Sequence, residues 1–316
     1  MFHMHFWIQG FVLTDFVTIS PKRMAMRRFL SHKAAVVSCV LLALMVLAVI
    51  LSPLTARYGV NQQVRKPPNT FLPPQKLAWF GTDEIGRDMY SRLIYGIRVS
   101  LIIGLFSALI STIVGCVIGA VAGFRGGRFD DVVMRVTDLF LAFPFLVALL
   151  VVRNTIGGIG WLTAIIGDKS SPRFVVFLLS FFGWMGVARI VRGQILALKE
   201  REFIEAARAV GATRRYIVRR HLLPNSIGPI MVALSFAVVG SIIAESTLAF
   251  FGYGPQAGDG GTSLGILVGA AKGAVQSGYW WIAVFPCFAL VLISLAINFI
   301  GDALRDATDP RLDRGE

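Results

Sequence analysis

The residues best suited to specific chemistry lie in one polar segment, residues 205–225, which reads EAARAVGATRRYIVRRHLLPN between two apolar runs. Gly211 predicts the end of a helix, because only glycine enters the left-handed backbone region without penalty. Thr213 can cap a second short helix, which Pro224 is expected to end. The segment therefore predicts a helix, a turn and a helix, suited to bind a soluble partner protein. Five arginines are scattered over it: Arg208, Arg214, Arg215, Arg219 and Arg220.

Spacing also suggests how the first of these helices is arranged. Phe203, Ala207 and Val210 recur at helical spacing and predict one apolar face. Glu205 can pair with Arg208 on another face. The plainer alternative for the whole segment is an ordinary basic loop that obeys membrane topology.

Motifs for catalysis are missing from the chain. It has no GxxxxGK[ST] phosphate-binding loop, so it is predicted not to hydrolyse ATP itself. Its four histidines and three cysteines show no metal-ligand or pairing pattern. No Ser-His-Asp or Cys-His set follows from residue order. We therefore predict a protein that is not an enzyme, has no metal site and binds no cofactor itself.

Two acidic residues fall inside apolar runs, where a charge is costly. Asp138 can pair with Arg135, three residues earlier on the same helix face. Glu245 can contact a positive group of a substrate, or it can form a structural hydrogen bond to a neighbouring loop. Its position near the end of its apolar run favours the structural role.

A row of small residues predicts a site of close helix packing. Gly115, Gly119 and Gly123 are each four residues apart and form a groove where a second helix can approach. That helix can belong to the same chain or to a partner subunit. The plainer alternative is that glycine is simply frequent in membrane helices.

The elements that position these residues are those of an all-α integral membrane protein. The chain is 55% hydrophobic and 16% charged, whereas soluble domains carry about 25% charged residues. Its mean hydropathy is +0.69. Six apolar runs are long enough to span a bilayer, and Pro144 predicts a kink in the third. The runs lie near 34–54, 99–122, 132–152, 174–192, 226–250 and 279–300.

The distribution of charge predicts the topology. A net charge of +13 would suggest nucleic acid in a soluble protein. Here the positive-inside rule accounts for most of the charge, so no nucleic-acid partner is predicted. The expected outer loop is an exception, since it is also basic, and long loops cross the membrane with little regard to charge. Both termini are expected to be cytoplasmic. The expected division is an N-terminal segment 1–33, a six-span domain 34–300 with an outer loop 55–98 and a cytoplasmic loop 193–225, and a tail 301–316.

The outer loop ends in residues 81–96, GTDEIGRDMYSRLIYG. Thr82 or Asp83 can cap a following helix. The apolar positions of that helix predict an amphipathic segment lying at the membrane surface; they are Met89, Leu93, Ile94 and Ile97. Aspartate and arginine lie so close here that we expect them to pair with one another and not to bind a substrate.

These segments together resemble permeases of ATP-binding-cassette importers, in the branch that takes dipeptides, oligopeptides or nickel. Residues 205–224 are similar to the EAA loop of the family, with His221 where the usual form has isoleucine. The runs ESTLAFFGYG and GDALRDATDPRL resemble two further segments of that branch, so the resemblance covers about residues 25 to 314. The outer run resembles the signature before the second span through Gly81, Thr82, Asp83, Gly86, Arg87 and Asp88.

The resemblance implies a type I importer fold with six spans and a cytoplasmic ATPase that receives the EAA loop as a coupling helix. It further implies a second, homologous permease as heterodimer partner, two ATPase subunits that bind ATP and Mg, and an external or periplasmic binding protein that delivers peptide. The chain would lie among lipids of a bacterial or archaeal plasma membrane. The implied coupling residues are Glu205, Ala206, Ala207, Gly211, Arg214, Arg215, Leu223 and Pro224.

Three alternatives remain at this point. A nickel or other small-solute importer shares the same motifs, although the spans hold no cluster of imidazole or soft ligands. An ion-driven secondary transporter would need several buried acids, and only Asp138 and Glu245 qualify. A membrane scaffold that carries nothing would not need the EAA loop.

Overall fold

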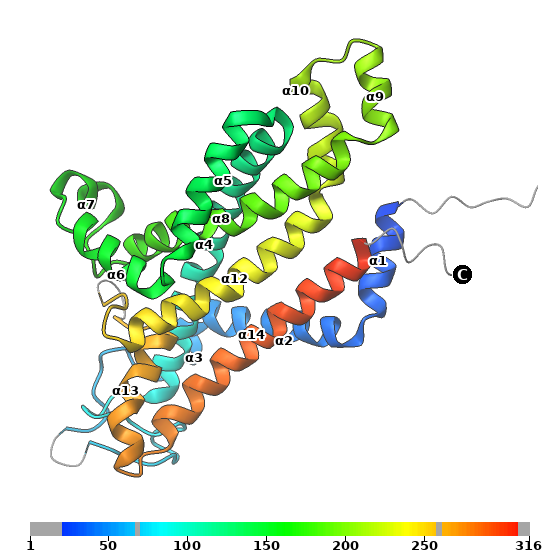
Figure 1. The fold of residues 1–316 in the computed structure, drawn as a ribbon. Helices are drawn as coiled ribbons and strands as arrows, with labels where there is room; N and C mark the ends of the chain where they lie inside the picture. Colours follow the sequence, from blue (N-terminus) through cyan, green and yellow to red (C-terminus); the bar gives the residue numbers. More distant parts are fainter. Residues whose placement is uncertain (1–20, 67–69, 257–260, 309–316) are drawn as a thin grey trace, which may run out of the picture.

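Helices account for most of the chain in the computed structural model, which describes residues 21–66, 70–256 and 261–308 (Figure 1). Residues 1–20 of the expected N-terminal segment and residues 309–316 of the expected tail lie outside this part. The helices are α1 Pro21–Ser31, α2 Lys33–Ile50, α3 Ser52–Thr55, α4 Met89–Arg125, α5 Gly127–Ala142, α6 Phe145–Ile156, α7 Gly160–Ile166, α8 Pro172–Lys199, α9 Glu202–Ala209, α10 Arg214–Ile217, the π-helix η1 Val218–Leu222, α11 Leu223–Asn225, α12 Ile227–Phe250, α13 Leu264–Gln276 and α14 Trp281–Thr308.

Within the described residues, five helices are long and apolar enough to cross a membrane, namely α2, α4, α8, α12 and α14. A sixth span results if α5 and α6 are counted together, so the predicted all-helical membrane fold is confirmed. The kink predicted at Pro144 in the third span is a sharp break, because α5 and α6 are bent by 98° between them. Pro144 lies in this break and lacks the N–H that would extend α5 beyond Ala142.

The closest helix packing joins α4 and α8. A Cβ atom added to Gly119 would lie 2.4 Å from the carbonyl oxygen of Ala188, and one added to Gly115 would lie 2.7 Å from that of Trp184. Gly123 likewise faces Ile195. The groove predicted from the three glycines is therefore occupied by a helix of the same chain.

The start of α4 differs from its prediction. Met89, Leu93, Ile94 and Ile97 are all buried. Met89, Leu93 and Ile97 belong to one core cluster with residues of α13 and α14. These residues form the first turns of a 37-residue helix, so the predicted surface helix is wrong. The apolar face was identified from spacing, but spacing alone does not distinguish a lipid surface from the packed helices that cover it here.

Figure 1 places the cytoplasmic loop and the outer loop at opposite ends of the long helices. The hairpin of α9 and α10 stands at one end, and α13 with the loop before α4 lies at the other. α1 contacts α14, whose C-terminal half runs back toward the hairpin end. The described ends of the chain thus lie on the side that the topology assigns to the cytoplasm.

Candidate coupling site and outer scaffold

The candidate coupling site is the hairpin of α9 and α10. Gly211 follows α9 with φ +81°, a left-handed conformation that favours glycine. Its N–H donates to the carbonyl of Arg208, and the N–H of Ala212 donates to that of Ala207, both at 3.0 Å. This pattern is a Schellman motif. The Thr213 hydroxyl accepts from the N–H of Tyr216 at 3.3 Å and caps α10.

Apolar residues on the underside hold the hairpin to the membrane helices. Ile204, Ile217 and Leu222 are at most 2% exposed, and they pack with Val191 and Ile195 of α8. Sequence reasoning missed these anchors because it assigned the apolar face of α9 to a different set of positions. The hairpin is therefore fixed at its base and does not hang as a free loop.

The predicted apolar face of α9 is instead its outer side. Phe203 is 42% exposed and Val210 is 83% exposed. His221 lies beside this side, with ring centroids 6.2 Å from Phe203 and 5.7 Å from Tyr216. Exposed apolar groups rimmed by charge are typical of a protein-binding surface.

The coupling residues implied by the resemblance lie on both sides of the hairpin, with Ala207 and Leu223 packed against the buried anchors. Ala207 and Leu223 are half-buried, and the others are exposed: Glu205, Ala206, Gly211, Arg214, Arg215 and Pro224. The expected pair of Glu205 with Arg208 is not formed among the described residues, so that prediction is wrong. Both charges are left available to a partner.

Pro224 does not end the second helix, which corrects the prediction. The backbone widens into the π-helix η1 immediately before it and continues through α11 into α12. A proline ring clashes with the carbonyl four residues earlier and cannot donate to it. A π-turn supplies the extra residue that relieves this conflict, so the hairpin leads directly into a membrane span.

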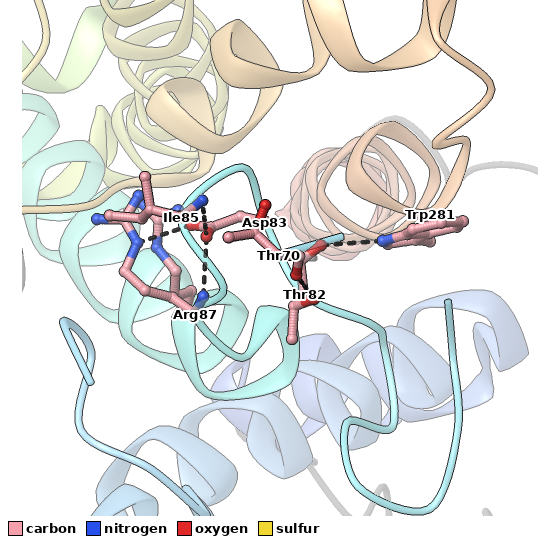
Figure 2. Close-up of polar contacts among 7 residues, drawn as sticks. Thr70, Thr82, Asp83, Ile85, Arg87 and Trp281 are labelled. Atoms are coloured by element: carbon pink, nitrogen blue, oxygen red, sulfur yellow. Dashed lines mark hydrogen bonds and ion pairs between the residues drawn. The ribbon is translucent and has the colours of Figure 1, made fainter. Parts of the chain in front are cut away.

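The outer signature forms a scaffold around Asp83, which is 2% exposed. Its carboxylate accepts from Arg87 Nε at 2.7 Å, from the N–H of Arg87 at 2.9 Å, and from Arg92 (Figure 2). It also accepts from the N–H of Ile85 at 3.1 Å. The expected pairing of aspartate with arginine is formed, and it fastens the loop to α4.

Thr82 extends the scaffold to the other side of the loop. Its hydroxyl donates to the carbonyl of Thr70 at 2.5 Å and accepts from the N–H of Leu72 at 2.7 Å. Its own carbonyl accepts from Trp281 Nε1 at 3.1 Å, which ties the loop to α14 (Figure 2). Figure 2 shows Asp83 and Thr82 directed to opposite neighbours.

The capping residue of α4 was misassigned. Asp88, not Thr82 or Asp83, accepts from the N–H of Ser91 at 2.8 Å. Two glycines complete the turn, because Gly81 and Gly86 have φ of +77° and +81°. A Cβ on Gly86 would lie 1.9 Å from the carbonyl oxygen of Arg65.

Two families of known proteins match this chain, and together their matches cover most of its length. Residues 115–314 match the family described as "Binding-protein-dependent transport system inner membrane component". Residues 20–74 match the "N-terminal TM domain of oligopeptide transport permease C". The chain belongs to this permease family.

Among its relatives, the permease is 36% identical to the dipeptide transport system permease protein DppC of Bacillus subtilis, over 94% of this chain and 88% of that protein. It is 34% identical to the oligopeptide transport system permease protein OppC of the same organism, over 91% and 89%. The inward-facing MetNI methionine ABC transporter has a similar fold, with 21% identity, a TM-score of 0.55 and coverage of 70% of this chain and 97% of that one.

Glu245 of the permease lies fully buried near the outer end of α12. Its Oε2 accepts from Ser100 Oγ of α4 at 2.8 Å, and Ser100 Oγ accepts from the N–H of Leu264 at 3.1 Å. The carboxylate thereby connects α4, α12 and the start of α13. This geometry favours the structural role over substrate contact.

Replacing Glu245 with glutamine is expected to lower the stability of the permease by about 1–2 kcal/mol and to leave solute preference unchanged, because it puts an amide N–H group in place of a carboxyl oxygen in a fully buried hydrogen-bonded site. Thermal unfolding in detergent and uptake of two competing solutes measure the two effects. Thr247→Val on the same helix is the matched control, because the Thr247 hydroxyl bonds only within α12, to the Ile243 carbonyl. Altered preference with unchanged stability would contradict the structural role.

Asp138 pairs with Arg189 of α8, so the prediction of a pair with Arg135 is wrong. About two helical turns before Asp138, Asp130 receives two bonds from Arg192, at 2.5 and 2.6 Å. The two pairs differ in accessibility, since Asp130 is 8% exposed whereas Asp138 is 64% exposed. The packing of α5 against α8 was not visible in sequence, so its cross-helix partners were missed.

Proposed function

We propose that this chain is a membrane subunit of an ATP-driven importer that moves dipeptides or oligopeptides by alternating access. The observation that carries the proposal is the hairpin of α9 and α10, with its buried anchors and its exposed apolar and basic side. The family is a membrane component of transport systems whose ATPase is a separate subunit. A fixed hairpin can transfer the motion of such a subunit to the spans.

The proposed partners follow from this role. They are a second, homologous permease that completes the translocation path, two cytoplasmic ATPases that hold ATP and Mg, and an external or periplasmic binding protein. The setting is a bacterial or archaeal plasma membrane. The chain itself is proposed to hold no cofactor and to bind no nucleic acid. Support for the hairpin as the ATPase contact comes from Phe203 and Val210, which are exposed beyond the packed core.

Peptide is the proposed solute because the named relatives are a dipeptide and an oligopeptide permease. A zwitterionic peptide needs a protein-lined wet path, because each unpaired charge or amide costs several kcal/mol in hydrocarbon. The exposed pair of Asp138 and Arg189 supports such a path, since a charge pair inside a span is costly when it faces lipid. Nickel is less well supported, because no three His, Cys, Asp or Glu side chains gather in the described ranges.

Reconstitution tests the proposal directly. The chain, its partner permease, the ATPases and the binding protein are placed in liposomes, and uptake of a labelled dipeptide, a labelled pentapeptide and radioactive nickel is measured with and without internal ATP. We expect ATP-dependent accumulation of peptide alone. Accumulation of nickel but not of peptide would contradict the proposed solute. Uptake driven by an ion gradient in the absence of ATP would contradict the proposed ATP-driven mechanism.

A further inference from the structure

A second feature of the predicted cytoplasmic end is a hollow that shares residues with the hairpin. An open cavity of about 470 Å³ lies between the end of α4 and the hairpin. We call it the inner basic cavity; it is lined by Phe124, Arg125, Arg208, Ala212, Arg214 and Ile217. Three separate elements thus contribute one arginine each.

The three arginines have no acidic partner. None of them forms an ion pair within the described residues, and none of the lining residues is acidic. On α5, which follows Arg125 in the chain, Asp130 is already bound by Arg192. Arg125 contacts only a ring, with its guanidinium carbon 5.4 Å from the Phe129 centroid. Three like charges around one hollow favour an anion between them.

The level of the cavity relative to the bilayer narrows the choice of anion. The apolar run of α4 ends near residue 122, so Arg125 lies about 4.5 Å farther along the helix axis. The polar headgroup layer on each side of a bilayer is roughly 5–8 Å thick. By this reckoning Arg125, on the α4 wall of the cavity, lies at the depth of lipid phosphates.

An apolar stripe on α4 leads away from the cavity toward the membrane centre. Its residues are 36–63% exposed and follow helical spacing, and Phe124 at the cavity wall continues it. They are Ile110, Ile113, Val114, Val117 and Val121. A hydrocarbon chain can pack along such an apolar stripe. An acidic side chain of a soluble protein could bind the arginines but would make no contact with the stripe.

We propose that the inner basic cavity binds the headgroup phosphate of an anionic phospholipid, with the acyl chains along the α4 stripe. Basic pockets between membrane helices on the cytoplasmic side are suited to anionic headgroups. The lipid would bridge α4 and the hairpin. The proposal concerns the chain and its membrane, so it does not depend on which solute is carried.

The test uses the full chain purified in detergent and mixed with equal amounts of phosphatidylglycerol and phosphatidylcholine that carry the same acyl chains. Native mass spectrometry counts the bound lipids. We expect a preference of about tenfold for phosphatidylglycerol, since each arginine adds attraction for the anionic headgroup. The variant with Arg125→Gln, Arg208→Gln and Arg214→Gln is expected to lose this preference, and Arg125→Gln alone to reduce it.

The matched control carries Arg128→Gln, Arg219→Gln and Arg220→Gln, which removes the same charge from exposed positions that do not line the cavity. It should keep the preference. An equal loss of the lipid preference in the control would show that any arginine on this surface attracts the anionic lipid. That result would contradict a specific site in the cavity. Displacement of the lipid by excess inorganic phosphate would assign the cavity to a free anion. Protection of Ala212→Cys from a thiol reagent by the ATPases, and not by phosphatidylglycerol, would assign it to a partner protein.

Discussion

Replacing Gly211 with leucine is expected to abolish ATP-dependent uptake while the chain still inserts into the membrane. Gly211 has φ +81°, and a leucine there costs about 1–2 kcal/mol of backbone strain. The hairpin would relieve that strain by abandoning the turn, which moves Phe203 and Val210 from the surface they share. Because no other atom lies within 4 Å of a Cβ at this position, no clash with the core contributes. Uptake in reconstituted liposomes and chain content of the membrane fraction are the measurements.

Gly211→Asn is the control for this prediction. Asparagine tolerates the left-handed region better than other residues, so much of the uptake should return. Normal uptake with leucine would remove the hairpin from the coupling mechanism. Loss of the chain from the membrane would instead show that the turn is needed for folding.

Replacing Gly119 with alanine is expected to destabilise the permease by about 1–3 kcal/mol, the usual cost of an overpacked interior. The added Cβ would lie 2.4 Å from the Ala188 carbonyl oxygen and 3.0 Å from its Cα, and these backbone atoms cannot move without separating α4 from α8. A lower unfolding temperature in detergent and less folded chain measure the effect. Gly119→Leu should fail to yield folded protein at all.

Gly186→Ala serves as the matched substitution. Gly186 is a helical glycine of α8 with no atom within 4 Å of an added Cβ. The Gly186→Ala variant should have an unchanged or slightly higher unfolding temperature, since alanine is a better helix former than glycine. Equal stability of the Gly119 and Gly186 variants would show that α4 and α8 are not in the close contact described.

Much of the fold could be predicted from the sequence, because membrane spans need long apolar runs and few other patterns produce them. The break at Pro144 was foreseen as a kink, but its size depends on how α5 and α6 pack, which residue order does not encode. The same limit applied to Asp138, whose partner Arg189 lies 51 residues away. Local spacing offered Arg135 instead.

In the candidate sites, too, features set by neighbouring residues could be predicted, whereas features set by contacts between distant segments could not. The turn at Gly211 and the cap at Thr213 are local chemistry, and both are present in the hairpin. The direction of α9 was not predictable, because Phe203 and Ile204 are both apolar neighbours and only the position of α8 decides which is buried. The effect of Pro224 depended on the π-turn, for which the sequence gives no recognised signal.

The nearly continuous helical path from Arg214 to Phe250, interrupted by a turn only at Ser226, has a mechanical consequence. At about 1.5 Å per residue it forms a stiff rod of roughly 55 Å, longer than a bilayer is thick. Tilting such a rod by about 5° displaces its far end by roughly 5 Å. A displacement at the hairpin end is thus transmitted toward Ser100 and Glu245 through two interruptions of the α-helix, the π-helix η1 and the turn at Ser226. The flexibility of these two points determines how much of the displacement reaches Glu245.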